Sequence, residues 1–417
     1  MASLIESTDG PLTLQFQNIT RVAGETVQGV INIDYRQVED DNLEELRVKF
    51  RGASNTQITV RTGQTTTTYR STELLFHTKI PVWKQGSAYP PPGLHILSCP
   101  FEFTLPSPLP PSFHCEAYHR SGTIGYSLEV VGQRSGIFRF NRRIRRLIPV
   151  IPAATPEQVA IKEALMQGWN GGWKTYARDD KLRRGLWGDY AHSRARLILP
   201  DLPSFPIGTP IPLSLIVETD TKPMLRSDAL DGPADKKGKP LFPAIPTASS
   251  QIPFKLYRWA QVSARRRTRT VEDEFSLLGS LGDPQAVAAV VHTVTPPEWI
   301  PQDDNKGKGI WRRSIRFDST LSIAYAPTYS TQIIQWQYQL RLRVEFPGIG
   351  NDLKIEIPIT LDSSTACPPP PLGIAGSSRV GGQTYADVLP AGPPPQMMDL
   401  PPAYFSGENH DWDDEKR

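Results

Sequence analysis

The side chains that catalysis and metal binding use most are scattered in this sequence. His114, Cys115 and His119 lie close together, but their spacing matches no zinc-binding pattern, so we interpret them as an ordinary loop. Ser127 lacks the second glycine of a nucleophile elbow and falls inside an expected strand. No other serine, cysteine or acidic residue belongs to a recognisable catalytic pattern. We therefore expect a protein that is not an enzyme and that holds no metal or cofactor.

A proline motif near the C-terminus indicates binding instead. Residues 400–404 read Leu400-Pro401-Pro402-Ala403-Tyr404, and Pro-Pro-x-Tyr is the sequence that WW domains bind. The prolines favour a polyproline II helix, so docking costs little conformational entropy, and the tyrosine fills a second pocket that sets the direction of the peptide. The motif occurs once, so no second copy adds avidity, and the strength of the interaction stays open.

Two clusters of arginine are the second candidate binding feature. Guanidinium groups suit paired hydrogen bonds to phosphate, so the clusters could form a cationic patch for phosphorylated peptides or phosphoinositides. The alternative is that they are solvated strand faces. The residues are Arg139, Arg142, Arg143, Arg145 and Arg146 in the first cluster and Arg265, Arg266, Arg267 and Arg269 in the second.

Composition narrows the class of protein and its compartment. The net charge is +3, but the 52 residues from Ala366 carry seven acids and three bases, so a basic body precedes an acidic tail. This charge is too mild to indicate nucleic-acid binding. The three cysteines form no even framework, which favours reduced thiols in the cytosol. We expect neither a secretion signal nor a membrane span, because the sequence has no long apolar run.

Alternating apolar residues predict an all-β protein. The period of two recurs in residues 12–16, 27–35, 46–50, 74–80, 211–217, 252–256, 334–346 and 353–361. One helix is expected, with Thr155 at its N-cap, Pro156 in its first turn and Gly168 after its end. Residues 63–68 and 222–250 are expected to be loops, and residues 169–190 are expected to connect two domains.

The two halves of the chain resemble a diverged repeat. Each half has a strand with a Tyr-x-Leu pattern, at Tyr126 and Tyr338, and later an apolar-Pro-apolar segment, at Pro149 and Pro358. The two tyrosines and the two prolines are separated by nearly the same number of residues. The agreement indicates two tandem copies of one fold.

The stretch from Cys99 to Gln133 carries a family resemblance. It contains a Phe-x-Phe-x-Leu-Pro strand from Phe101, a Leu-Pro-Pro-Ser-Phe crossing at residues 109–113, and a Gly-x-Ile-x-Tyr-Ser-Leu-Glu-Val strand from Gly122. These segments, with the strand at residues 24–30, look like the core of an arrestin N-terminal domain. The layout with a Pro-Pro-x-Tyr tail resembles the alpha-arrestins, the arrestin-related trafficking adaptors, of fungal-like type.

The resemblance implies two tandem arrestin-like, immunoglobulin-like β-sandwiches. The implied domains are 1–153 and 193–365, with a helix-containing linker at 154–192 and a proline-rich tail at 366–417. Ten of the 52 tail residues are proline and only seven are Leu, Ile, Val or Phe, so we expect the tail to be disordered.

The implied function is that of an adaptor. Through its WW-ligand motif it would join the cytosolic tails of membrane transporters or receptors to a HECT ubiquitin ligase, for ubiquitination and endocytosis. Such a protein would be cytoplasmic and recruited to the plasma membrane or endosomes, with anionic lipid as a further partner and no nucleic acid. Two alternatives are a retromer-like trafficking scaffold that recruits no ligase, and a β-sandwich hydrolase, which would need clustered catalytic side chains.

Overall fold

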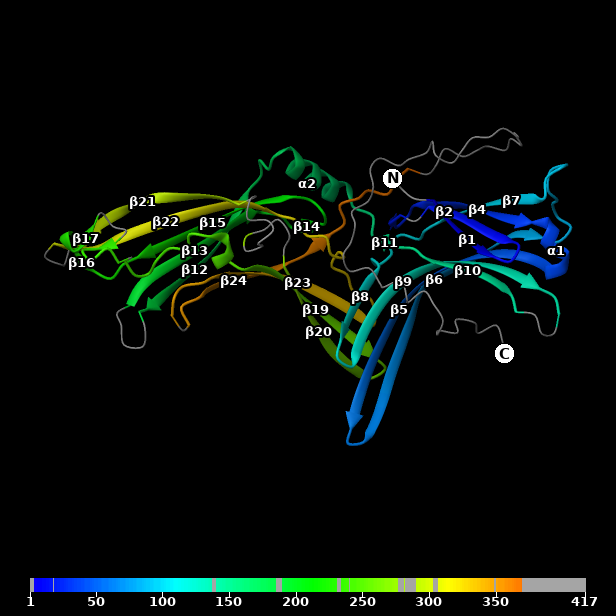
Figure 1. Ribbon diagram of the computed structural model, residues 1–417, viewed down its shortest axis with the longest axis horizontal. Coiled ribbons are helices and arrows are strands. Elements are labelled where there is room, and N and C mark those ends of the chain that lie inside the picture. The colour runs from blue at the N-terminus through cyan, green and yellow to red at the C-terminus, as the bar shows by residue number, and fades with distance from the viewer. Residues whose placement is uncertain are drawn as a thin grey trace.

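The computed structural model describes residues 4–17, 19–136, 140–184, 190–230, 234–239, 241–276, 281, 290–302, 307–348 and 350–369. Two β lobes lie along the long axis of the molecule, and helix α2 (Pro156–Gln167) lies near the point where they meet (Figure 1). We call the part formed by β1 to β11 the N-lobe and the part formed by β12 to β25 the C-lobe. Among the described residues, no helix is long and apolar enough to cross a bilayer.

Two sheets form the N-lobe. The first has the order β1-β2-β4-β7, and the second has the order β10-β9-β5-β6, with β8 also paired to β9. The strands are β1 (Leu4–Asp9), β2 (Leu12–Gln17), β4 (Thr26–Asp34), β5 (Leu43–Thr62), β6 (Thr65–Lys84), β7 (Ile96–Thr104), β8 (Phe113–Ala117), β9 (Arg120–Arg134) and β10 (Arg142–Leu147). A parallel pair, β3 (Arg21–Val22) and β11 (Val150–Ile151), and the short helix α1 (Tyr35–Asp41) complete the lobe.

The C-lobe also has two main sheets, ordered β12-β13-β15-β22-β16 with β21 on β22, and β20-β19-β23-β24. Their strands are β12 (Trp173–Arg183), β13 (Tyr190–Pro200), β15 (Ile211–Asp220), β16 (Met224–Leu225), β19 (Phe254–Ala264), β20 (Arg267–Ser276), β21 (Val291–Pro301), β22 (Lys308–Leu321), β23 (Ile334–Val344) and β24 (Leu353–Ile359). Smaller elements are β14 (Phe205–Pro206), β17 (Ala229–Leu230), β18 (Ala234–Asp235), β25 (Leu361–Asp362), η1 (Arg226–Asp228) and η2 (Ser249–Gln251).

The predicted alternation is what builds these sheets. In β9 the side chains of Ile124, Tyr126, Leu128 and Val130 are all almost completely buried. Successive side chains of a strand point to opposite faces, so a period of two gives each sheet one apolar face to press against another sheet. Phe50 of β5 meets Phe103 of β7 across the N-lobe, with ring centres 4.7 Å apart. The expected all-β fold of paired sandwiches is confirmed.

The repeat extends to individual hydrogen bonds. In the N-lobe, the Val150 amide donates to the Ser112 hydroxyl and the Ser112 amide donates to the Val150 carbonyl. In the C-lobe, Leu361 and Thr328 make the same two-way pair. Each pair adjoins a short parallel bridge, β3 with β11 and β14 with β25. The structural counterpart of Val150 is therefore Leu361, two residues beyond the apolar-Pro-apolar segment on which the sequence comparison was based.

The two repeat tyrosines test this equivalence directly. The Tyr126 hydroxyl donates to the Pro110 carbonyl and the Tyr338 hydroxyl donates to the Ala326 carbonyl, at 2.5 and 2.8 Å, and both rings are 1% exposed. Each hydroxyl ties its strand to the preceding proline-containing crossing. We expect Tyr126→Phe and Tyr338→Phe each to lower the free energy of unfolding by about 1–2 kcal/mol, because each leaves a buried carbonyl without its donor. Urea unfolding measures both, and a loss in only one of them would contradict the equivalence.

Helix α2 follows its predicted boundaries. The Thr155 hydroxyl accepts the Gln158 amide, and the Gln158 side chain accepts the Thr155 amide, which makes a capping box with Pro156 in the first turn. Gly168 follows the last turn with a φ of 99°. The sequence had not indicated a second helix, but α1 is present, capped by the Asp34 side chain.

The segments at residues 169–190 and 63–68 differ from their predictions. Most of the expected connector forms β12, which pairs antiparallel with β13 along its whole length and becomes an edge strand of the C-lobe. Most of its side chains are exposed, on both faces, so no apolar alternation could reveal it. The expected loop at residues 63–68 narrows to a turn of two residues, because Thr62 already pairs with Thr65 and threonine favours strands.

Candidate functional site

The WW-ligand motif and one arginine lie outside the described residues. These are Leu400, Pro401, Pro402 and Tyr404 with the rest of the tail from residue 370, and Arg139. The predictions made for them stay predictions. The other eight candidate arginines are described, and the geometry separates them into groups that their sequence spacing does not reveal.

Strand alternation divides the first cluster between two faces of β10. Arg142 and Arg146 stand on the side of the core residue Ile144, where they reach β1 of the other sheet. The Arg146 Nε donates to the Ser7 hydroxyl at 2.7 Å. Arg143 and Arg145 stand on the opposite, outer face, because neighbours in a strand alternate. Four arginines that are close in sequence therefore do not form one patch.

Arg142 is held by the carboxylates of its own lobe. Its Nη2 lies 2.7 Å from Asp41 Oδ1 at the end of α1, and its Nη1 lies 3.1 Å from Asp9 Oδ1. Arg134 Nη2 contacts the same Asp41 oxygen at 3.0 Å. The hydrogen bond to Asp41 is the main reason why the pKa of Arg142 is raised. Gly10, with a φ of 60°, lies so close that a Cβ there would be 2.7 Å from Arg142 Nε. This geometry makes Arg142 a clamp between β1, α1 and β10.

The outer pair has a different environment. Arg143 Nη1 lies 3.5 Å from Glu129 Oε1, and its side chain is 41% exposed. Burial lowers the pKa of Arg145, with the nearby Arg143 charge acting in the same direction and Glu129 opposing it. Arg145 borders a recess in the outer face of the sheet, together with Arg51 and Arg70.

The second cluster forms the tip of the β19–β20 hairpin. Arg265 and Arg266 make the turn, and Arg267 and Arg269 begin β20; all four side chains are exposed. The tip reaches the N-lobe, where the Arg265 amide donates to the Ser71 hydroxyl at 2.8 Å. The guanidinium carbon of Arg267 lies 5.6 Å from the Tyr69 ring centre. These four arginines are therefore presented to solvent beside the β5–β6 hairpin.

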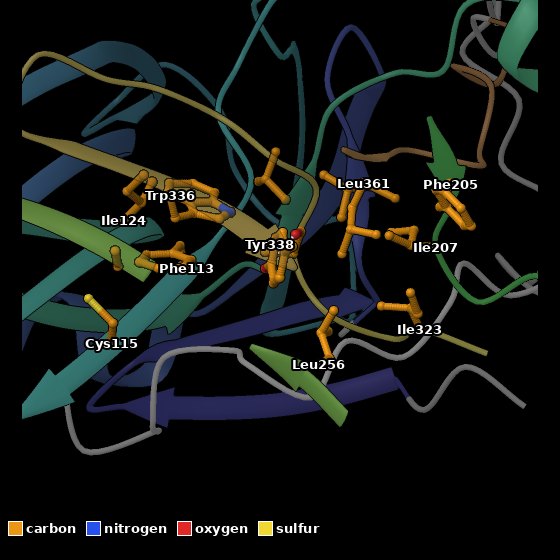
Figure 2. Packing of buried hydrophobic residues seen from close by; sticks show 14 of the residues in the cluster. Phe113, Cys115, Ile124, Phe205, Ile207, Leu256, Ile323, Trp336, Tyr338 and Leu361 are labelled. Carbon is orange, nitrogen blue, oxygen red and sulfur yellow. Dashed lines mark hydrogen bonds between the residues drawn. The ribbon is translucent and has the colours of Figure 1, made fainter. Parts of the chain in front are cut away.

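The junction of the lobes is built on an aromatic stack that sequence analysis missed. Phe113 of β8 lies on Trp336 of β23, with ring centres 3.9 Å apart and planes 10° from parallel. Figure 2 shows this stack within one apolar cluster that continues from Ile124 of the N-lobe to Tyr338 of the C-lobe. The two lobes therefore share a core.

A buried cation also packs at this junction. Arg258 of β19 is only 3% exposed, and its guanidinium carbon lies 4.7 Å from the Phe113 ring centre and 5.1 Å from that of Phe275. Its Nη2 lies 2.8 Å from Asp273 Oδ2 and also donates to the His114 carbonyl at 3.1 Å. An arginine on aromatic faces gains cation–π energy that grows with desolvation. In sequence Arg258 is an isolated residue, so only the β8–β19 contact identifies it.

His114, Cys115 and His119, the residues first considered as metal ligands, belong to regular elements of the N-lobe. They form strand β8 and the turn after it instead of the expected loop. Burial lowers the pKa of His114, whose Nδ1 lies 3.2 Å from the Thr123 hydroxyl. Cys115 is 1% exposed and faces the core (Figure 2), while His119 adopts a φ of 64° in the turn. Among the described residues, no three His, Cys, Asp or Glu side chains gather in a way that could hold a metal ion.

All three cysteines are free thiols, with Cys99 and Cys115 buried and Cys367 exposed. Burial raises the pKa of the Cys99 thiol to about 11.

Comparison with known proteins agrees with the geometry of the N-lobe. Residues 12–156 match the family described as arrestin (or S-antigen), N-terminal domain. The match runs from β2 to the first residue of α2 and includes the segments on which the resemblance to an arrestin N-terminal domain was based, but not the tail motif. No curated protein matches the chain significantly. Residues 12–156 are thus an arrestin-like N-terminal domain, and this match supports an arrestin-like family for the chain.

Proposed function

We propose that this protein is a non-enzymatic trafficking adaptor of the alpha-arrestin type, fungal-like, that joins membrane cargo to a WW-domain HECT ubiquitin ligase. An arrestin-type domain supports an adaptor role in general. The observation that carries the specific proposal is the presence, in one chain, of this domain and a single Leu-Pro-Pro-x-Tyr motif in a proline-rich tail. The ubiquitin ligase would bind the motif, and the β lobes would bind the cargo.

The start of the tail is tied to the body of the protein. The Ala154 amide donates to the Thr365 carbonyl, and Lys162 Nζ of α2 donates to the Ser364 carbonyl. Cys367 lies against Gly24 of the N-lobe, where an added Cβ would be 3.2 Å from its sulfur. About 30 residues separate this anchor from the motif, which for a disordered chain, as composition predicts, is a reach of roughly 30 Å. A ligase bound there would stay within reach of cargo on the body.

The exposed arginines support binding to an anionic surface. The β19–β20 tip presents Arg265, Arg266, Arg267 and Arg269 without burying them, which suits phosphorylated cytosolic tails of transporters or receptors and anionic lipid. In this proposal the protein is cytoplasmic and is recruited to the plasma membrane or endosomes by such contacts. Arg142 and Arg146 would contribute little, because they already bind groups of the N-lobe.

Binding of the full-length chain to isolated WW domains tests the ligase tether. We expect Tyr404→Ala to weaken this binding at least tenfold, because the tyrosine pocket of the WW domain would stay empty. Phe405→Ala is the matched control, since it removes the neighbouring aromatic ring but keeps the motif, and it should bind as the wild type does. Unchanged binding of Tyr404→Ala would overturn ligase recruitment. A coat-type partner that co-purifies with a chain lacking residues 366–417 would favour the retromer-like scaffold instead.

A further inference from the structure

Strand β21 (Val291–Pro301) is an edge of the larger C-lobe sheet. Among the residues that the structure describes, it pairs with β22 on one side and with no strand on the other. Figure 1 shows it along one margin of the C-lobe, away from the N-lobe. Its first five side chains, at residues 291–295, are exposed on both faces of the strand. The outer edge of β21 therefore offers backbone N–H and C=O groups to another strand.

The sequence of this edge differs from that of the other sheet edges. Residues 291–295 read Val-His-Thr-Val-Thr, with four β-branched residues and no lysine, arginine or acid. β-Branched residues favour strands, and an exposed edge without charges is a template for pairing. The edge strand on the far side of the same sheet, and those of the other main sheets, all carry charged side chains. Examples are Glu6 in β1, Glu73 in β6, Glu102 in β7, Arg143 in β10, Asp180 in β12, Glu272 in β20 and Glu356 in β24.

Two features within β21 limit the free edge to residues 291–295. The pairing with β22 shifts register between Thr295 and Glu298, so the strand is irregular there. Pro296 and Pro297 lie at this point and have no backbone N–H to donate. The regular part that remains is close to the usual length of a strand, about five to six residues.

The inner face of the sheet reaches this edge without being covered. His292 and Val294 lie opposite Phe317 and Ile315 of β22, which are both 0% exposed. Cross-strand partners share a face, so His292 and Val294 belong to the apolar inner face of the sheet. Val294 is nevertheless 53% exposed. This apolar surface at the margin of the sandwich would be buried if the sheet continued into a further strand.

A second copy of this chain provides a matching strand. Side chains alternate between faces, so only registers that place even-numbered residues opposite even-numbered ones keep both inner faces on the same side. A two-fold axis at Thr293 gives such a register. It places His292 opposite Val294 and Val291 opposite Thr295, so no like charges meet. The edge is thus complementary to itself.

A flexible peptide matches this edge less well. It would lose conformational entropy on becoming a strand, whereas β21 of a second copy is already held in place by β22. Peptides that add a strand to a sheet also depend on pockets for alternate side chains. Residues 291–295 are exposed on both faces, so they enclose no side chain of an added strand. These arguments favour a second copy as the occupant.

We propose that two copies of this protein associate by antiparallel pairing of residues 291–295 of β21. The pairing joins the two larger C-lobe sheets into one continuous sheet across a two-fold axis. Five paired residues make a small interface, so we expect a dissociation constant of roughly 1–100 μM. The edge lies apart in the sequence from the WW-ligand motif and from the β19–β20 tip, so the dimer and the proposed adaptor function can fail independently.

The dimer has a consequence for ligase binding, which rests on the proposed function. Each chain has a single WW-ligand motif, but a dimer carries two. A partner with two linked WW domains would then bind both tails and gain avidity, whereas a partner with one WW domain would gain nothing.

Sedimentation velocity of the full-length protein, between about 1 and 300 μM, tests the dimer. The central variants are Thr293→Lys and Thr293→Glu. Each places two like charges directly opposite each other at the two-fold axis, whereas an equimolar mixture of the two pairs opposite charges. We expect dimerisation to be at least tenfold weaker in each variant, and to recover in the mixture to within about threefold of the wild type. Thr293 is exposed, so neither change should disturb the fold of a single copy.

Thr175→Lys is the matched control, because Thr175 is an exposed threonine on β12, the opposite edge of the same sheet. It should dimerise as the wild type does. Amide exchange in residues 291–295 of the wild type should also slow as the protein concentration rises. A wild type that is monomeric at about 300 μM would overturn the proposal and leave an extended peptide as the occupant. A dimer that Thr293→Lys does not weaken, or a mixture that does not recover, would overturn it as well.

Binding to WW domains separates the dimer from the adaptor function. Two linked WW domains should bind the wild type at least tenfold more tightly than Thr293→Lys, while a single WW domain should bind both proteins equally. If neither protein binds any WW domain, the adaptor function fails, and the sedimentation result for the dimer stands.

Discussion

Replacing Phe113 by alanine is expected to lower the free energy of unfolding by about 3–5 kcal/mol, the range for removing a fully buried aromatic ring. Phe113 is 0% exposed and lies between Trp336, 3.9 Å away, and the guanidinium of Arg258, 4.7 Å away. Its removal would leave a cavity at the junction and take one aromatic face from a buried cation. The loss should therefore affect both lobes.

Hydrogen exchange detects that coupling. In Phe113→Ala, amide exchange should rise in β8 and also across the junction, in β19 and β23. The control is Phe50→Ala, which removes another fully buried ring that packs inside the N-lobe against Phe76 and Phe103. We expect a similar loss of stability there, with the rise in exchange confined to the N-lobe. If exchange in β19 and β23 stays at the wild-type rate in Phe113→Ala, the stack does not couple the lobes.

Asp41→Ala is expected to destabilise the N-lobe by about 3 kcal/mol, near the lower end of the range for breaking a buried ion pair. The Asp41 carboxylate is 8% exposed and contacts both Arg142 and Arg134. Removing it leaves two arginines close together, with the Asp9 carboxylate 3.1 Å from Arg142. We place the loss at the lower end because the Arg142 side chain is 32% exposed and water can solvate part of its charge.

An exposed ion pair provides the control. Glu345 lies 3.6 Å from Arg343, and both side chains are more than 40% exposed. Glu345→Ala should cost less than about 1 kcal/mol, since solvent screens such pairs. Chemical unfolding of the two variants under the same conditions compares them. Equal losses would show that the contact of Asp41 with Arg142 and Arg134 does not stabilise the N-lobe more than an exposed ion pair does. That result would favour the first arginine cluster as a binding surface.

Sequence patterns predicted the structure correctly where the pattern depends on residues of a single strand or helix. The alternation of Ile124, Tyr126 and Leu128 predicted a strand with one buried face, and the residues around Thr155 predicted the start of α2. Both patterns describe contacts between near neighbours in the chain. The paired tyrosines likewise indicated a repeat that the hydrogen bonds of Ser112 and Thr328 support.

Sequence analysis did not predict the strand that is held mainly by backbone pairing. Strand β12 exposes most of its side chains on both faces, so its composition resembles that of a linker, although it pairs with β13 throughout. Its position at the edge of a sheet, and not the polarity of its side chains, decides its structure. The division of the first arginine cluster between two faces of β10 also escaped sequence analysis, although residues adjacent in a strand point in opposite directions.

By itself, the sequence determined the all-β class, the repeat, helix α2 and the arrestin-like identity of the N-lobe, because these depend on period and on motifs of contiguous residues. The tertiary structure alone decided which cations act together. Arg258 meets Phe113 across the junction, and Arg51, Arg70 and Arg145 share a recess, although both groups are assembled from separate strands. The physical reason is that strand order and register place side chains side by side irrespective of their distance along the chain.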